Sequence, residues 1–250
     1  MSDVHGAADA LARAGDGADV LVCLGDLILF VDYEDPSQGI LADLFGAERA
    51  AHFIALRTAD RFEEARAYSA ELWREVPGDR WEVIRDRVDA QYEALFAALP
   101  SPAYLTYGNV DIPALWPRHL RPGHTVLDGE VVEIDGVSAG FVGGGLTSPM
   151  RTPFEVSEEE FAAKVDRIRG CDVVFSHIPP AVPELCYDVA ARRFERGSRA
   201  LLDLVRTTAP RLLVHGHVHQ PLVARTRIGR TECVNVGHFR ARRRPYVLAW

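Results

Sequence analysis

Short apolar runs, each ending in a glycine or a polar residue, recur along this chain and constrain its fold more than any other feature. The runs cover residues 20–24, 104–107, 131–134, 137–142, 173–176, 212–215, 222–228, 233–236 and 246–249. Their lengths and boundaries are typical of buried strands. Helical spacing predicts helices at 7–14 and at about 197–208, and a capping box of Ser157 and Glu160 begins a third that ends near Gly170. Helices alternate with strands at both ends of the chain, which favours a layered α/β fold.

Residues 40–98 have a different composition, rich in Ala, Glu and Arg, with apolar residues at helical spacing. Three helices are predicted there, near 40–56, 58–75 and 80–98, with a break at Pro77-Gly78. We therefore expect one domain over residues 1–250 that carries a helical insertion at about 40–98. A packed cap, a lid over a substrate site and the interface of a homo-oligomer are three roles that this insertion could have.

Composition restricts the class of protein. The net charge of −8 argues against non-specific nucleic-acid binding, and no apolar run approaches the length of a membrane span. No CxxC motif is present, so neither a disulfide framework nor a thiolate zinc site is expected from the scattered Cys23, Cys171, Cys186 and Cys233. No signal peptide is visible at the start, and a reducing cytoplasm is the expected location.

Histidine, aspartate and asparagine gather in five short segments with the character of strand ends. These are Asp3-Val-His5-Gly, Gly-Asp26, Gly-Asn109-Val-Asp111, Ser-His177-Ile-Pro-Pro and Gly-His217-Val-His219. In an extended segment, residues two apart point to the same side, so the first and the last segment could each aim two side chains at one cavity. Neutral imidazole and carboxylate together suit first-row metals such as Mn, Fe or Zn. Each segment alone is a weak signal, and their order along the chain is the informative part.

This series of segments resembles the calcineurin-like metallophosphoesterases over nearly the whole chain outside residues 40–98. The resemblance implies a four-layer αββα sandwich that binds two divalent metal ions. Carried over position by position, it implies one metal held by Asp3, His5 and His219, and another held by Asn109, His177 and His217. Asp26 would bridge the two metals, and Asn109 and Asp111 would be catalytic. The implied activity is hydrolysis of small-molecule phosphodiesters or phosphomonoesters by a metal-bridging hydroxide.

One position departs from the family pattern in a way that bears on mechanism. The family usually has a histidine directly after the asparagine of the third segment, where it is thought to protonate the leaving group, and this chain has Val110. A leaving group of low pKa needs little protonation, so phosphodiesters are slightly favoured over monoesters. His119 or His124, in the following loop, could replace the missing acid, although both also fit surface positions.

The start of the chain is a second departure. The family places its first aspartate at the end of a buried apolar strand, whereas only Met1 and Ser2 precede Asp3 here. We therefore expect that the first strand is missing from the chain as given and that the true start codon lies upstream. The alternative is that Asp3 lies on a short tether.

Other polar groups have structural interpretations. His215 lies two residues before the His217/His219 pair and is expected to be structural. A basic cluster near the C-terminus is expected to be a solvated loop, with nucleic-acid contact as the alternative, and it contains Arg240, Arg242, Arg243 and Arg244.

A non-catalytic scaffold of the same fold is the rival interpretation from a different functional class. Scaffolds tolerate the loss of metal ligands, and every ligand position of the pattern is filled here, which favours an enzyme. A nuclease acting on DNA or RNA ends is a third hypothesis, but it would need a basic groove that the sequence does not indicate.

Overall fold

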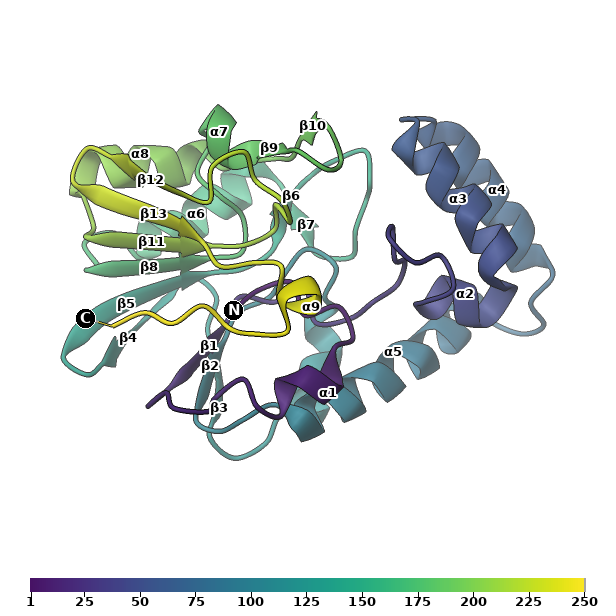
Figure 1. Ribbon diagram of the computed structural model, residues 1–250, viewed down its shortest axis with the longest axis horizontal. Coiled ribbons are helices and arrows are strands. Elements are labelled where there is room, and N and C mark those ends of the chain that lie inside the picture. Colours follow the sequence, from purple (N-terminus) through teal and green to yellow (C-terminus); the bar gives the residue numbers. More distant parts are fainter. Residues whose placement is uncertain (250) are drawn as a thin grey trace.

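The computed structural model describes residues 1–249 and shows a mixed α/β fold built on two sheets (Figure 1). The smaller sheet is parallel and has the order β1 (Leu21–Cys23), β2 (Ala103–Leu105) and β3 (His124–Val126). The larger sheet has the order β12 (Arg225–Ile228), β13 (Thr231–Asn235), β11 (Leu212–His215), β8 (Val173–Ser176), β5 (Val137–Val142) and β4 (Glu130–Ile134). Its four inner strands are parallel, and the two edge strands pair antiparallel to them.

Three hydrophobic cores explain how the layers hold together. Between the sheets, Leu24 from the end of β1 packs with Phe141 and Phe175 of the larger sheet. Helices α6 (Glu158–Arg167) and α8 (Arg199–Thr208) cover the other face of the larger sheet, where Phe161 is fully buried. Helices α1 (Ala8–Leu11) and α5 (Arg80–Ala98) cover the smaller sheet through residues such as Phe96. Apolar side chains on both faces of each sheet thus produce the layered α/β arrangement that the sequence predicts.

The predicted insertion is helical and lies between β1 and β2. It consists of α2 (Ile40–Phe45), α3 (Ala47–Thr58), α4 (Phe62–Arg74) and α5. The single helix predicted at 40–56 is wrong, because Gly46 adopts φ 85° and separates α2 from α3. Helix α5 packs into the core, whereas α3 and α4 pack on each other and stand away from the sheets (Figure 1).

The predicted strands at 137–142, 173–176 and 212–215 are confirmed to the residue as β5, β8 and β11. The strand predicted at 246–249 is wrong, because this segment is irregular. Tyr246 and Leu248 pack against the core between the sheets while Val247 is exposed, so the alternation reflects one-sided burial without strand pairing. The capping box of Ser157 and Glu160 is confirmed at the start of α6.

Short elements complete the fold between and after the strands. They are the 3-10 helix η1 (Pro113–Arg118), β6 (Gly145–Leu146), β7 (Glu155–Val156), α7 (Pro183–Cys186), β9 (Tyr187–Asp188), β10 (Arg193–Phe194) and α9 (Phe239–Arg242). Within residues 1–249, no helix has both the length and the apolar character needed to cross a bilayer. All four cysteines are buried and free.

The first residues of the chain run alongside β1. The Met1 amino group donates to the Val22 carbonyl, and the Leu24 N–H donates to the Met1 carbonyl. On the other side, the Phe239 N–H donates to the Ser2 carbonyl. Asp3 is therefore held between two neighbouring segments and is completely buried. The missing first strand and the upstream start codon stay predictions.

Candidate metal centre

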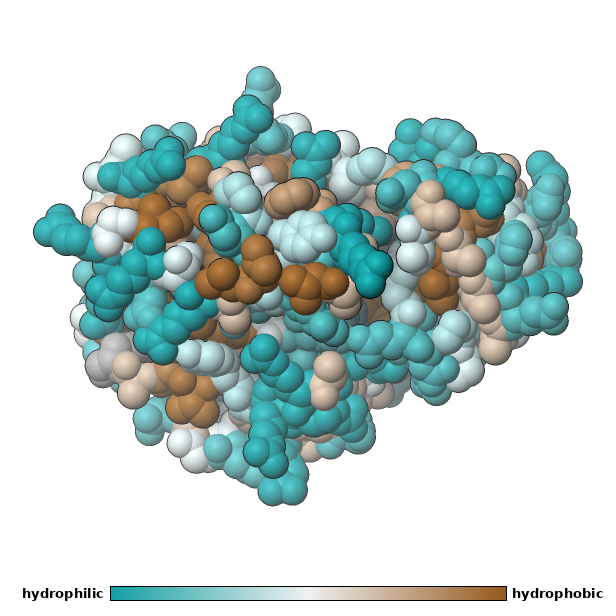
Figure 2. All heavy atoms as spheres, turned by 45° about the horizontal axis from the view of Figure 1, so that its top comes forward, coloured by the Kyte–Doolittle hydropathy of each residue, from teal (hydrophilic) through white to brown (hydrophobic). Residues whose placement is uncertain are grey.

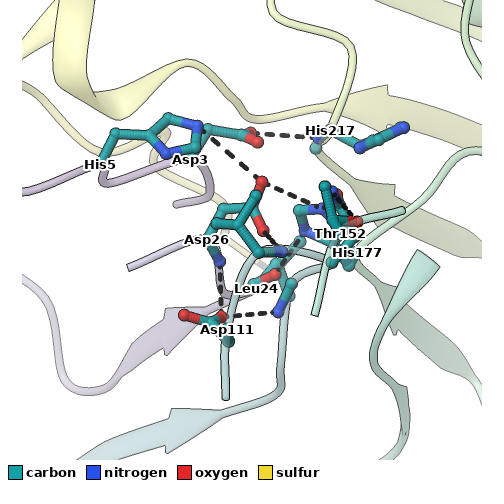
Figure 3. Close-up of polar contacts among 12 residues, drawn as sticks. Asp3, His5, Leu24, Asp26, Asp111, Thr152, His177 and His217 are labelled. Carbon is teal, nitrogen blue, oxygen red and sulfur yellow. Dashed lines mark hydrogen bonds and ion pairs between the residues drawn. The ribbon is translucent and has the colours of Figure 1, made fainter. Parts of the chain in front are cut away.

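The predicted ligands lie on loops at the carboxyl ends of parallel strands. Asp26 follows β1, Asn109 follows β2, His177 follows β8, and His217 follows β11. The carboxyl ends of parallel strands form one edge of a sheet, where polar side chains from different loops meet. Figure 3 shows Asp3, His5, Asp26 and His177 gathered where these loops approach one another.

Glycines before two of the ligands let the loops approach closely. Gly25 has φ 87°, and a side chain there would collide with the backbone of Gly108. A side chain at Gly108 would in turn collide with the Asp26 carboxylate. The Gly-Asp and Gly-Asn pairs in the sequence therefore reflect two loops whose backbones touch.

The first ligand group is formed by Asp3, His5 and His219, whose ligand atoms all lie within 4.8 Å of one another. His5 Nε2 is 3.2 Å from His219 Nε2, and His219 Nε2 is 3.6 Å from Asp3 Oδ1. His5 Nδ1 lies 3.1 Å from the Ile28 carbonyl, so Nε2 is the nitrogen that faces the group. Asp3 Oδ1 is buried and accepts no hydrogen bond within residues 1–249, which leaves it available to a cation.

The second ligand group is formed by Asp26, His177 and His217, again within 4.8 Å. His177 Nδ1 lies 2.8 Å from the Leu24 carbonyl, which directs Nε2 into the site. The side-chain oxygen of Asn109 is 2.9 Å from His177 Nε2, while its amide nitrogen donates to Thr152 Oγ1 at 3.0 Å. The sequence prediction that Asn109 joins this group is consistent with that geometry.

Asp26 lies between the two groups. Its Oδ2 is 3.8 Å from His5 Nε2 and 3.5 Å from His177 Nε2, so one oxygen faces both groups. Its Oδ1 accepts a hydrogen bond from the Val110 N–H at 2.9 Å. Asp26 therefore lies between histidines of both groups, and its role as a shared ligand stays a prediction.

Four of the predicted ligands adopt left-handed backbone conformations. Asp3, His5, Asp26 and His217 all have positive φ, between 41° and 68°, although none is glycine. Such conformations cost about 1–3 kcal/mol each and persist where surrounding structure enforces them, commonly at functional sites. Six other non-glycine residues of the described chain share this conformation, so the strain accompanies the ligand loops without being unique to them.

The protonation states suit metal binding. Burial lowers the pKa of His5 and of His217, which favours the neutral imidazole with a lone pair for a cation. Burial alone would raise the pKa of Asp3, but its interaction with His219 holds it well below its ordinary value. Burial alone would lower the pKa of His219, but Asp3 raises it. A cation in the first group would therefore compete with protonation of His219.

Asp111, predicted to be catalytic, lies behind the two ligand loops. Its carboxylate accepts hydrogen bonds from the N–H groups of Asp26, Leu27 and Gly108, at 2.8, 3.0 and 2.8 Å. Burial and the Asp26 charge raise the pKa of Asp111 to about 7. Because it contacts the loop backbones and is fully buried, its observed interactions are those of a residue that positions Asp26 and Asn109. Its catalytic role stays a prediction.

The other predicted histidines lie outside the two groups. His119 contacts Asp89 at 2.9 Å and stacks on Phe96, and His124 also packs beside Phe96. Neither therefore stands in for the acid that is missing at Val110, and both are packed side chains of the core behind the smaller sheet. His215 is completely buried, and its Nε2 has no hydrogen-bond partner within residues 1–249, consistent with the structural role expected.

Three arginines of the basic cluster, Arg242, Arg243 and Arg244, are exposed, in agreement with the solvated segment that was expected, although Arg242 ends the short helix α9. Arg240 differs, because its side chain returns to the site. Arg240 donates from Nε and Nη2 to Asp32 Oδ2 at 3.0 and 2.6 Å, and from Nη1 to the His5 carbonyl at 2.8 Å. Arg240 thus fixes the backbone of a ligand. Composition gave no indication of this contact, because Asp32 is more than 200 positions away in the chain.

His238 was also missed. Its ring stacks on that of His219, with centroids 4.0 Å apart and planes at 13°, and it is 7% exposed. It directly follows the Asn235-Val236-Gly237 segment, and no spacing in the sequence connects it to the other histidines.

No protein-family model matches the chain, and no curated protein matches it.

Proposed function

We propose that the protein is a dinuclear metal-dependent phosphoesterase of the calcineurin-like type. The observation that carries the proposal is the Asp26 carboxylate, one oxygen of which faces two separate groups of metal-ligating side chains. The layers support the same conclusion, because helices cover the outer face of each of two packed sheets. That order is the one expected of an αββα sandwich.

The donor set fits first-row divalent cations. Imidazole nitrogen, carboxylate oxygen and one amide oxygen are the ligands that Mn, Fe and Zn accept in proteins. Asp3 and Asp26 are the only carboxylates in the two groups, so two divalent cations would leave the site with a net positive charge. When bound, such cations activate water as a nucleophile and neutralise phosphoryl oxygens. An anionic phosphoester is the substrate class that this charge favours.

The environment of Val110 favours phosphodiesters with good leaving groups over monoesters with poor ones. The Val110 N–H is used by Asp26, and the valine side chain has no proton to donate. His119 and His124 are held elsewhere, so neither supplies the missing donor. A leaving group that departs as a stable anion needs no proton donor. The rate of hydrolysis of such substrates is therefore reduced least by a valine at the position of the histidine.

Activity profiling with one metal at a time tests the proposal. The apoprotein is loaded with Mn, Fe or Zn and assayed with bis(4-nitrophenyl) phosphate and with 4-nitrophenyl phosphate. We expect turnover of both and a higher kcat/KM for the diester. Bound metal without turnover of either substrate, for every cation, would replace the proposal by a non-catalytic metal-binding scaffold.

A further inference from the structure

A cation of the helical insertion, Arg57 of α3, lies against the loop between β6 and β7. One of its Nη2 hydrogens is directed at the Met150 carbonyl at 3.5 Å, and Nη2 also contacts the Met150 sulfur. The guanidinium carbon is 5.9 Å from the centre of the Tyr33 ring and 5.4 Å from that of Phe53. Within residues 1–249, no carboxylate forms an ion pair with Arg57, although the side chain is half-buried. Its charge is therefore partly removed from water without being neutralised, which is costly unless an anion binds there.

The loop that Arg57 contacts also holds a candidate ligand. Thr152 Oγ1 accepts from Asn109 Nδ2 and donates to Glu155 Oε1 at 2.8 Å. Glu155 also accepts from the Ser148 N–H at 2.8 Å, which closes the loop. Met150 is two residues from Thr152, and two residues span at most about 7 Å. Arg57 is thus next to the part of the loop that orients Asn109.

A second segment faces the same space. Arg193 of β10 pairs with Glu195 at 2.7 Å, and Glu195 acts electrostatically on the ligand His217. Tyr33 is 44% exposed and lies beside Arg57, and the charges of Arg57 and Arg193 both act electrostatically on its hydroxyl. In Figure 1, the β9–β10 hairpin and the β6–β7 region lie on the side of the main body that faces α3. Figure 2 shows mostly hydrophilic side chains where the insertion meets the main body.

We propose that Arg57 and the exposed Tyr33 bind a second anionic group of the substrate, beyond the phosphoryl group held at the metal centre. This inference rests on the proposed phosphoesterase function and narrows its substrate class to phosphoesters with a carboxylate or phosphate on the ester group. A guanidinium presents several N–H donors in one plane to such an anion, and the Tyr33 hydroxyl can add one more. The insertion then serves as one wall of the substrate site.

Arg66 provides a matched control within the same structure. It also donates to a carbonyl of the β6–β7 loop, that of Pro149 at 3.4 Å, but it forms an ion pair with Glu63. Arg66 and Arg57 therefore both tether the loop, and only Arg57 has an uncompensated charge. If tethering were the whole role of Arg57, the two arginines would have equivalent effects on ligand preference.

The test measures binding of non-hydrolysable phosphonates to the metal-loaded protein by calorimetry. The probes are ω-carboxyalkylphosphonates with three to eight carbons, each compared with the alkylphosphonate of equal length. In the unchanged protein we expect about tenfold tighter binding of the carboxylate at the chain length that spans the two sites. Arg57→Gln should abolish this preference, Arg57→Lys should retain part of it, Tyr33→Phe should reduce it, and Arg66→Gln should leave it in place.

The outcomes separate this inference from the function on which it rests. The inference is overturned by equal affinity for both probe series at every length, or by an undiminished preference in Arg57→Gln. Turnover of a phosphoester in the same protein would still uphold the phosphoesterase. If neither series binds and no phosphoester is hydrolysed, the proposed function fails and the inference fails with it. Should Arg57→Gln not fold, Arg57→Lys and Tyr33→Phe still decide the result, because a preference unaltered in both contradicts it.

Discussion

The Asp26 carboxylate uses its two oxygens differently. Oδ1 is fixed by the Val110 N–H, and Oδ2 faces histidines of both ligand groups. Asp26→Asn keeps the shape but removes the negative charge from the shared position. We predict loss of turnover and a lower content of both metals, measured by elemental analysis and a phosphodiester assay. Asp19→Asn, at an exposed position before β1, is the control. Near-normal metal content and turnover in Asp26→Asn would contradict the shared-ligand assignment.

Val110 occupies the position where a proton donor would help most. Its N–H donates to Asp26 and its side chain is half-buried against the core, so a substitution changes the side chain without removing that hydrogen bond. We predict that Val110→His raises turnover chiefly for poor leaving groups, by up to about 10²-fold, because a positioned acid contributes on that order. The measurement is the slope of log kcat/KM against leaving-group pKa. Val110→Phe supplies a ring without a donor, and equal slopes for all three proteins would show that this position has no acid role.

His215 should impose a pH dependence on the stability of the metal-free protein. Burial lowers its pKa from 6.5 to about 4 in the folded protein. Between these values the unfolded chain binds a proton that the folded protein does not, so the free energy of unfolding falls as pH falls through this window. We predict that His215→Leu removes up to about 3 kcal/mol of the difference between pH 7 and pH 4, since each pKa unit corresponds to about 1.4 kcal/mol. The free energy of unfolding of both chelator-treated proteins is measured by denaturant unfolding at several pH values. If it changes equally with pH in the two proteins, the prediction is wrong.

At the scale of elements, α5 connects the insertion to the metal centre. The Tyr92 hydroxyl of α5 accepts from the Ile112 N–H at 2.8 Å and lies 3.4 Å from Asp111 Oδ1. Asp111 in turn holds the N–H groups of the Asp26 loop. The insertion therefore contributes to the site from behind as well as at its rim.

Tyr92→Phe tests this connection. It leaves a buried N–H without its acceptor and removes one contact of Asp111, so we predict a loss of about 1–2 kcal/mol in the free energy of unfolding. Metal affinity should also fall, because the loop that carries Asp26 is less firmly held. The control is Tyr68→Phe in α4, whose hydroxyl makes no hydrogen bond within residues 1–249. Equal stability and metal affinity in the two variants would contradict the role given to Tyr92.

The sequence predicted the strand ends and the ligand groups because both have local signals. A buried strand that ends at Gly-Asp or Ser-His can be recognised from a few neighbouring residues, as at Asp26 and His177. The contacts of Arg57 and Arg240 have no such signal, since their partners are distant in the chain and only the packing of loops brings them together. The break at Gly46 was missed because helical spacing continues across it, and only the positive φ shows the interruption.

At the scale of the whole molecule, the site is assembled from both sheets. Asp3, His5 and Asp26 belong to the segments around the smaller sheet, whereas His177 and His219 follow strands of the larger one. Each ligand group includes side chains from both sides. The net charge of −8 repels anions from the surface as a whole. Cations held by the two ligand groups, together with Arg57, would therefore determine where an anionic substrate binds.

Metal binding should accordingly stabilise the whole fold, because each cation joins segments that separate on unfolding. A ligand that binds only the folded state adds about 2.7 kcal/mol at a free concentration of 100 times its Kd, and about 1.4 kcal/mol for each further tenfold increase. We predict that chelation lowers the unfolding midpoint in denaturant and that added Mn²⁺ restores it with this logarithmic dependence. Asp26→Asn should weaken the dependence more than Asn109→Ala, since Asp26 faces both groups and Asn109 only one. If the unfolding midpoint responds to Mn²⁺ equally in both variants, the two groups bind their cations independently. If the midpoint of the unchanged protein does not respond to Mn²⁺, these ligands do not hold Mn²⁺ in the folded state.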